Sequence, residues 1–156
     1  MYKHILIPTD GSELSKLALE EGVALAKALD ARVTIITVTP PFQPAAVMLT
    51  DAPEQYKNHM AAIAKQYLEE GKKIAATAGV ECDLARVEHE HPYKAIIDTA
   101  QKQGCDAIHM ASHGRSGISA VLLGSETLKV LTHSTIPVIV CRRPHLAKLV
   151  QDAFAS

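Results

Sequence analysis

The chain has 156 residues, of which 47% are apolar and 21% charged, as expected for one globular domain with a proper core. Its formal charge is −1, and its only aromatic residues are four Tyr and two Phe. This composition argues against a nucleic-acid-binding surface, which needs a basic face or stacking platforms. No apolar run approaches the roughly 18 residues of a membrane span, and no signal-peptide pattern precedes residue 5. We therefore expect a cytoplasmic protein with neither nucleic acid nor membrane as a partner.

The first half of the chain alternates apolar strands with amphipathic helices. Residues 5–8 form a continuous apolar run, typical of a strand covered on both faces, and end in a polar turn. Apolar residues then recur every three or four positions through residue 29, which predicts a helix capped by Ser12 or Ser15. Residues 32–39 are rich in β-branched side chains and predict a second interior strand. We interpret residues 40–52 as a surface loop, in which residues 47–49 cover a ligand or contact a partner unless the loop is a plain insertion.

The second half repeats the alternation. A helical stripe runs from Tyr56 to Ala78 and stops at Gly79, and residues 80–87 alternate as an edge strand does. A further helix starting at Pro92, a strand at 105–110, a helix from Ser125 to near His133 and a strand at 137–141 follow. Residues 144–156 form a tail, predicted to be a short helix that covers the domain, covers a dimer partner or is simply appended.

Two smaller features carry alternative interpretations. His89 and His91 stand at alternate positions and suggest a metal site, but no third and fourth ligands are evident, so a polar turn before Pro92 is the competing interpretation. The number of cysteines is odd and no two of them form a C-x-x-C pair, which predicts free buried thiols. The three cysteines are Cys82, Cys105 and Cys141.

Five strands alternating with four helices predict a parallel sheet with right-handed crossovers and helices on both faces. The patterns do not fix the strand order. A switch point between the first and fourth strands would bring residues 8–10 and the loop after the fourth strand into one crevice, and this is the arrangement we expect. Asp10 would then accept hydrogen bonds from a ribose or help hold a divalent cation. Alternatively, it is a turn aspartate that bonds its own backbone.

The loop after the fourth strand, residues 110–117, is rich in Gly and Ser and leads to Gly124 and Ser125 at a helix start. Glycines allow close backbone approach, and the free amides and positive end of a helix make a phosphate seat. Hydroxyls from Ser112, Ser116 and Ser125, with Arg115 at the rim, would add donors. The competing interpretation is a Gly-rich helix entrance with Ser125 as N-cap. Residues 114–117 also match the weak G-x-x-G clamp of KH modules, which the topology and charge oppose, and the usual dinucleotide and P-loop signatures are absent.

From residue 5 to residue 142 the chain resembles a universal stress protein domain. The resemblance is carried by the opening Ile-Leu-Ile-Pro-Thr-Asp-Gly-Ser, by Ser-His-Gly-Arg-Ser-Gly after the fourth strand, and by Leu-Leu-Gly-Ser followed by Pro-Val-Ile-Val. The nucleotide-binding branch has the pattern G-x2-G-x9-G-[ST]. Gly114, the next nine residues, Gly124 and Ser125 match that pattern, whereas Ala111 stands where the first Gly would be.

The resemblance implies a three-layer α/β/α sandwich over residues 1–143, with a five-stranded parallel sheet in the order 3-2-1-4-5 and a homodimer that pairs the fifth strands (Val138–Cys141). The implied ligand is ATP, with Mg²⁺ or Mn²⁺. An acid beside a triphosphate needs such a cation between them, which applies to Glu126. The implied site residues are Pro8, Thr9, Asp10 (also a candidate cation ligand) and Val38 on the adenosine side; Met110 and Ala111 at the ribose; Gly114, Arg115, Ser116, Gly124, Ser125 and Glu126 at the phosphates; and His113 and Gly117 in the same loop.

Three functional hypotheses remain open at this level. The leading one is an ATP-binding stress-response protein that acts as a nucleotide-dependent switch or sensor without efficient catalysis. The second is slow ATP hydrolysis or self-phosphorylation, for which His113 is the only candidate general base, although such a histidine more often only hydrogen-bonds a neighbouring group. The third is a dimeric interaction module without nucleotide, and it rests on Ala111.

Overall fold

The computed structural model describes residues 1–43, 52–114 and 123–142. Strands and helices alternate along the chain as the sequence predicts. The strands are β1 (His4–Pro8), β2 (Arg32–Thr39), β3 (Cys82–Glu88), β4 (Ala107–Ala111) and β5 (Val138–Cys141). The helices are α1 (Glu13–Leu29), α2 (Ala52–Ala78), α3 (Pro92–Lys102) and α4 (Ser125–His133). The predicted contact of residues 47–49 and the predicted helix in the tail lie outside the described residues.

All neighbouring strands are parallel, and their order is β3-β2-β1-β4-β5. This confirms both the order implied by the resemblance and the expected switch point between β1 and β4. β3 is an edge strand, as predicted, and it exposes its charged side chains. Because β1 and β4 are parallel neighbours, the loops that follow them leave the same edge of the sheet side by side.

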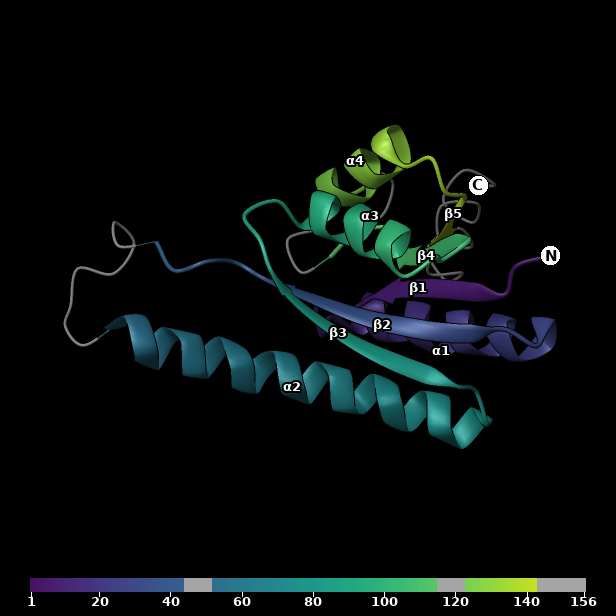
Figure 1. Ribbon diagram of the computed structural model, residues 1–156, viewed down its shortest axis with the longest axis horizontal. Helices are drawn as coiled ribbons and strands as arrows, with labels where there is room; N and C mark the ends of the chain where they lie inside the picture. Colours follow the sequence, from purple (N-terminus) through teal and green to yellow (C-terminus); the bar gives the residue numbers. More distant parts are fainter. Residues whose placement is uncertain (44–51, 115–122, 143–156) are drawn as a thin grey trace, which may run out of the picture.

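Two apolar layers hold the helices against the sheet. Figure 1 shows α1 and α2 on one face and α3 and α4 on the other. The first layer joins Leu19 of α1 and Leu68 of α2 to Ile5 of β1, all nearly inaccessible to solvent. The second layer joins the α3 and α4 side chains to Leu6, Ile36 and Ile108 of the strands. In the part of the chain that the structure describes, no helix combines the length and apolarity of a membrane span.

The helix ends follow the signals in the sequence. Ser12, one of the two predicted caps, is the N-cap of α1, and its Oγ accepts a hydrogen bond from the Ser15 amide at 3.2 Å. Asp30 ends α1 in the left-handed conformation (φ 52°), and Gly79 (φ 71°) follows α2. Pro92 occupies the first turn of α3, where its missing N–H costs no hydrogen bond.

All three cysteines are free thiols, as predicted. Cys105 and Cys141 are buried, whereas Cys82 is only half-buried. Burial raises the pKa of the Cys141 thiol to about 12 and that of the Cys105 thiol to about 11. Both therefore stay protonated near neutral pH and behave as small apolar side chains rather than nucleophiles.

Two histidines are buried in the sheet. His109 on β4 is 4% exposed and lies beneath Gly22 of α1, where an added Cβ would come within 3.0 Å of its Nδ1 and 2.7 Å of Ile7 Cδ1. His4 on β1 is equally buried, and its Nε2 lies 2.8 Å from Thr34 Oγ1. The Nδ1 atoms of both histidines lack a hydrogen-bond partner among the described residues. Burial lowers the pKa of both imidazoles, with Arg32 adding to the effect at His4, so the folded protein disfavours their protonation.

We predict that the protein loses stability on acidification below about pH 6.5. In the unfolded chain a histidine has its ordinary pKa of about 6.5. Below that pH the unfolded chain therefore binds protons that the buried imidazoles of the folded protein do not bind. Stability therefore falls from about pH 6.5 down to the lowered folded pKa values. Melting temperatures measured from pH 8 to pH 5 should fall in that window, and His109→Leu should flatten the profile. An unchanged slope in that variant would contradict a role for His109, with His59→Leu on the exposed face of α2 as the control.

Candidate functional site

The loops after β1 and β4 touch at the switch point. A Cβ added to Gly114 would run into Asp10 Oδ2, so the absence of a side chain at Gly114 makes room for this carboxylate. The other carboxylate oxygen, Asp10 Oδ1, accepts a hydrogen bond from the Ser12 amide at 3.0 Å. Asp10 therefore bonds the backbone of its own turn, as the alternative interpretation predicts, and it also faces the β4 loop.

Thr9 anchors the β1 loop from below. Its amide donates to the Ile36 carbonyl at 2.9 Å, and its own carbonyl accepts from Thr37 Oγ1 at 3.1 Å. Thr9 Oγ1 lies 3.2 Å from Ser15 Oγ, and the whole residue is 6% exposed. The Thr9 side chain thus belongs to a hydroxyl network under the turn, and Pro8 and Asp10 are its more accessible neighbours.

Tyr67 of α2 covers this turn, a contact that sequence reasoning missed. Gly11 has φ +75°, and a Cβ on it would overlap the Tyr67 ring. The Gly after Asp10 signals a positive φ, but nothing in the local sequence indicates which distant side chain lies against it.

Val38 lies where β2 continues past the end of β1. Pairing of β1 with β2 ends at Pro8 and Ile36, and the Ile36 carbonyl is directed toward β1. Backbone direction alternates along a strand, so the N–H and C=O of Val38 point to the same side as those of Ile36, beyond the last β1 residue. The sheet therefore presents one donor and one acceptor of Val38 to the crevice.

Met110 and Ala111 end β4 and face opposite layers. Met110 packs with the α3 and α4 side chains, whereas the Ala111 methyl packs with Leu14, Ala18 and Cys141 beneath α1. Ala111 is 8% exposed, and its carbonyl accepts a hydrogen bond from Thr127 Oγ1 at 2.9 Å. The methyl group that replaces the motif's first Gly is thus held in the apolar layer under α1.

Gly124 closes the β4 loop on itself. Its amide donates to the Ser112 carbonyl at 2.8 Å, and the Ser112 amide donates to the Cys141 carbonyl at 2.9 Å. A Cβ on Gly124 would lie 2.9 Å from His113 Cα and 3.0 Å from His113 Cβ, so only glycine fits without displacing backbone. Gly124, not Ser125, is the N-cap of α4, which corrects the alternative interpretation of Ser125. The chain must turn back toward Ser112 at the cap position, and Ser125 is the first helical residue.

The amino end of α4 opens onto this crevice. The first intrahelical bond runs from the Leu128 amide to the Gly124 carbonyl at 3.0 Å, which leaves the amides of Ser125, Glu126 and Thr127 outside the helical ladder. Gly124 supplies no side-chain cap. The positive end of the helix dipole thus lies beside Ser112 and His113 of the β4 loop.

Glu126 is directed away from this opening, toward α3. Its Oε2 accepts a hydrogen bond from the Tyr93 amide at 2.9 Å, and its Oε1 pairs with Lys129 Nζ at 3.0 Å. The structure therefore brings Asp10, Gly114, Gly124 and Ser125 together, while the Glu126 carboxylate is engaged elsewhere. Sequence reasoning missed Tyr93 as its partner, since the two residues lie 33 positions apart.

His113 turns back onto its own loop, where its Nδ1 lies 3.2 Å from Ser112 Oγ. This contact matches the expectation that a histidine in such a loop hydrogen-bonds a neighbour. The other predicted phosphate-loop residues, Arg115, Ser116 and Gly117, lie outside the described residues.

The suggested metal site at His89 and His91 gains no further ligand. The His91 amide donates to His89 Nδ1 at 2.8 Å, and the two rings are 6.0 Å apart between centroids. Within residues 1–43, 52–114 and 123–142, no three His, Cys, Asp or Glu side chains form a group that could hold a metal ion. The segment is better described as the polar turn that leads to Pro92.

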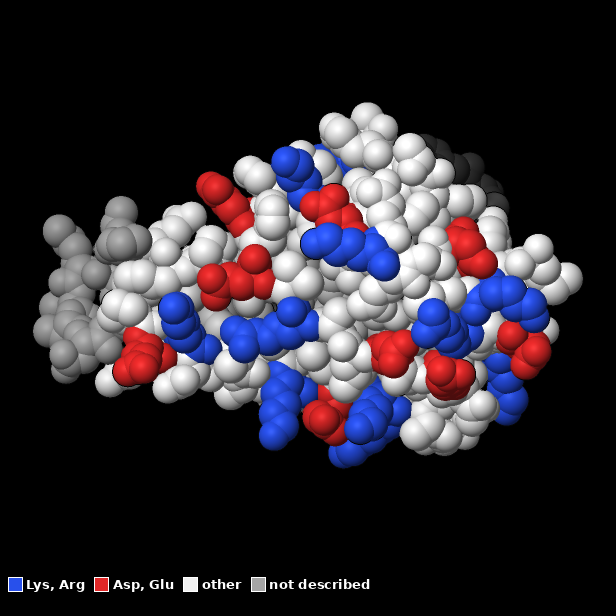
Figure 2. Space-filling view, viewed as in Figure 1, with Lys and Arg blue, Asp and Glu red and all other residues white. Residues whose placement is uncertain are grey.

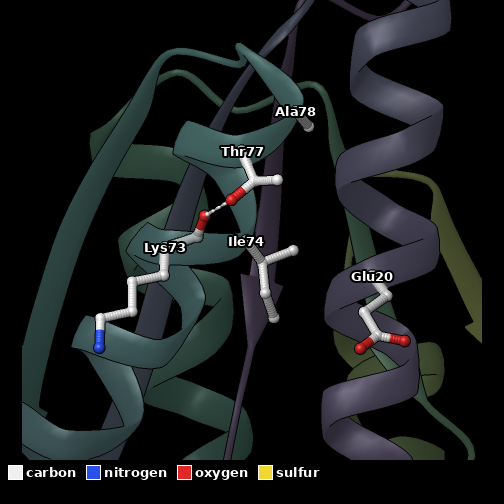
Figure 3. A pocket seen from close by; sticks show the side chains of 5 residues that line it. All are labelled: Glu20, Lys73, Ile74, Thr77 and Ala78. Atoms are coloured by element: carbon white, nitrogen blue, oxygen red, sulfur yellow. Dashed lines mark hydrogen bonds between the residues drawn. The ribbon is translucent and has the colours of Figure 1, made fainter.

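Two other surface features lie away from the crevice. A shallow groove between α1 and α2 is flanked by Glu20 and Lys73, and Figure 3 shows the Lys73 side chain directed away from Glu20, which leaves no converging polar groups. On the face seen in Figure 2, basic and acidic side chains are interspersed rather than gathered by sign. Neither feature resembles a ligand site as closely as the crevice does.

Comparison with known proteins agrees with the fold. The family model described as Universal stress protein family matches residues 1–142. Universal stress protein YxiE of Bacillus subtilis is 32% identical over 91% of this chain and 100% of its own length. The solved structure of MJ0577, a universal stress protein of Methanocaldococcus jannaschii, is 32% identical, covers 92% of this chain and 97% of that one, and has a TM-score of 0.79. A universal stress protein solved in complex with cAMP shares the fold at 24% identity and a TM-score of 0.71, over 90% of this chain and 97% of that one.

We predict that Thr127→Val destabilises the protein by about 1 to 2 kcal/mol, because the buried Ala111 carbonyl loses its side-chain donor. Thr132→Val is the matched control, since Thr132 Oγ1 bonds the Leu128 carbonyl at 2.7 Å on the exposed face of α4, where water replaces the lost donor. Urea unfolding of both variants measures the difference. Equal effects would show that the Thr127 bond does not anchor α4 to β4.

Proposed function

The chain belongs to the universal stress protein family, and we propose that it binds an adenine nucleotide in the crevice between the β1 and β4 loops. In this proposal it acts in the cytoplasm as a nucleotide-dependent switch or sensor of the stress response. The observation that carries the proposal is the meeting of Asp10 and Gly114 beside the open amino end of α4.

The proposed phosphate position rests on two glycines whose surroundings leave no room for a side chain. At Gly124 a Cβ would press on the His113 backbone, and at Gly114 it would meet the Asp10 carboxylate. A ligand backed against these glycines reaches the free amides of Ser125 and Thr127, which suit a phosphate oxygen. Asp10, on the opposite loop, suits the ribose hydroxyls or a cation carried by the nucleotide.

The adenosine side rests on Val38. A backbone donor and acceptor from one extended residue complement the N1 acceptor and N6 donor of adenine, whereas guanine presents the reverse order at that edge. Pro8 ends β1, the strand beside β2, and Met110 lies on β4, the strand beyond it. The cAMP complex of a protein with this fold is a precedent for an adenine nucleotide on the same scaffold.

Ala111 is the reason to consider a module without nucleotide, and its packing favours binding instead. Its methyl group lies against Leu14 and Ala18, on the α1 side of the sheet, so it occupies little of the space in the crevice. Because His113 is turned toward Ser112, we propose binding, with ATP and Mg²⁺ or Mn²⁺ as the first ligands to test, and assign no catalytic residue.

We predict that nucleotide binding is lost in Gly124→Val. Small molecules released by denaturing the purified protein should include an adenine nucleotide, or the emptied protein should bind ATP with Mg²⁺ in calorimetry. Gly124→Val should weaken that binding at least about tenfold, because its side chain would displace the His113 backbone. Gly104→Ala is the control for lost stability, since Gly104 has a positive φ (+66°), unlike Gly124 (φ −62°), and lies outside the crevice with open space around it.

If the wild-type protein releases no nucleotide and gives no heat of binding, the proposal is wrong, and the interaction module without nucleotide remains. Equal weakening in Gly104→Ala would mean that the Gly124 effect reflects stability rather than the site.

We further propose that the protein is a homodimer that pairs its β5 strands. β5 is an edge strand, and the carbonyls of Pro137 and Cys141 are directed toward β4, so Val138 and Val140 direct their N–H and C=O outward. Leu128 and Leu131 of α4, the helix that precedes this edge, are large apolar side chains exposed at 53% and 38%. An unpaired edge beside exposed apolar side chains favours a partner strand.

We predict that Val140→Pro yields a monomer, because proline removes an outward N–H while sparing the bonds to β4. Arg86→Pro makes the same change at an outward position of the opposite edge strand, β3, and should leave the dimer intact. Sedimentation equilibrium of the two variants distinguishes the edges. A monomeric wild-type protein, or a dimer that survives Val140→Pro, would contradict the β5 interface.

A further inference from the structure

A tyrosine of α2 lies against the turn that carries Asp10. Gly11, the residue after Asp10, has a φ of +75°, and a Cβ added to it would overlap the Tyr67 ring. The ring therefore packs directly on the Gly11 backbone. A residue with a side chain would meet both obstacles here, the left-handed backbone angle and the ring, so glycine is required at this position.

Other contacts hold α2 in place beside the turn. Gly71, one helical turn further along α2, packs against Ile35 of β2, and an added Cβ there would lie 2.7 Å from Ile35 Cδ1. Lys16 Nζ of α1 pairs with Glu70 Oε1 of α2 at 2.7 Å. Since α1 begins directly after the turn, these two contacts keep the Tyr67 ring over it.

The direction of the Asp10 carboxylate depends on the backbone of Gly11. The hydrogen bond from the Ser12 amide to Asp10 Oδ1, at 3.0 Å, spans Gly11, so it forms only at suitable Gly11 angles. Glycine has the widest choice of backbone angles of any residue, and the Tyr67 ring occupies space into which the Gly11 backbone could otherwise move. The other carboxylate oxygen, Oδ2, lies where a Cβ of Gly114 would be.

We propose that Tyr67 is a positioning residue, whose ring holds the Gly11 backbone in the conformation that directs the Asp10 carboxylate to Gly114. The inference rests on the proposed nucleotide site and adds a residue of α2 that acts on it through the β1 turn. The apparent affinity of a ligand falls with the fraction of molecules in the binding-competent conformation. The Tyr67 ring keeps that fraction high.

Replacing the ring tests this role. Tyr67→Leu keeps an apolar side chain but removes the ring, and calorimetry with ATP and Mg²⁺ should give a dissociation constant about three- to tenfold higher, as when a third to a tenth of the molecules keep the competent turn. Tyr67→Phe keeps the ring and should restore the affinity. Tyr56→Leu is the matched control on α2, since the Tyr56 ring packs with Phe42 at 5.5 Å between centroids, and should leave the affinity unchanged.

A double-mutant cycle tests the route through Asp10. If Tyr67 acts by directing this carboxylate, adding Tyr67→Leu to Asp10→Asn should weaken binding by less than about twofold, because the two changes remove the same interaction. If the ring contacts the ligand itself, or contributes only to the stability of the fold, the effects of the two changes are independent. Losses that multiply therefore overturn the inference.

Deuterium exchange of the Ser12 amide tests the turn without any ligand. Tyr67→Leu should lower its protection at least about threefold, since the bond to Asp10 opens more often. Leu68→Ala is the control for lost stability, because it removes a buried apolar side chain of α2 and keeps the ring, and it should leave the Ser12 protection unchanged.

Unchanged Ser12 protection in Tyr67→Leu, or an equal loss in Leu68→Ala, would show that the ring does not hold the turn. A wild-type protein that fails to bind ATP with Mg²⁺ would overturn the proposed function instead, and the exchange measurement would then still decide whether Tyr67 directs Asp10.

Discussion

The hydrogen bond from the Gly124 amide to the Ser112 carbonyl decides the shape of the crevice. It joins Ser112, which follows β4, to the N-cap residue of α4, so the two ends of the intervening loop lie next to each other. The bond can form only because Gly124 has no Cβ, which would press on the His113 backbone. Thr127 repeats the connection one turn later, with its hydroxyl on the Ala111 carbonyl. The amino end of α4 is thereby held against the carboxyl end of β4, and the crevice has a rigid wall.

The sheet order supplies the opposite wall. Since β4 lies beside β1 rather than beside β3, the β1 turn faces the β4 loop, and Asp10 reaches Gly114. That turn is itself braced by Thr37 below and Tyr67 above. The β1 turn and the described ends of the β4 loop are thus held by contacts to β2, α2 and α4.

Much of this could be predicted from local patterns, and the remainder depends on contacts between distant segments. Continuous apolar runs located the strands, and Ser12, Gly79 and Pro92 marked helix ends, because each acts through its own backbone. The glycines at 114 and 124 indicated close approach, although they did not say to what. The strand order came only from the family resemblance, since alternation of strands and helices is the same for several orders. Sequence reasoning missed the contact of Tyr67 with Gly11 and the hydrogen bond between Glu126 and Tyr93. Both join residues far apart in the chain, and the local pattern of a helix does not indicate which distant residues it contacts. Sequence reasoning also missed the direction of the Ala111 methyl, because its consequence depends on α1 covering that face of β4.

The cap that Glu126 provides also limits how a switch in this fold could work. α3 and α4 share a carboxylate at their amino ends and pack with each other over one face of the sheet. A ligand that changes the position of α4 at the crevice must therefore either carry α3 with it or leave the Tyr93 amide without a partner. The first outcome moves the surface formed by both helices as a unit, and the second loosens the first turn of α3 beside His91. In either case the change reaches the outer face of α3 and α4, whereas α1 and α2, on the other side of the sheet, are tied to the β1 turn. If the proposed nucleotide site acts through α4, its effect is for this reason expressed on the α3–α4 face.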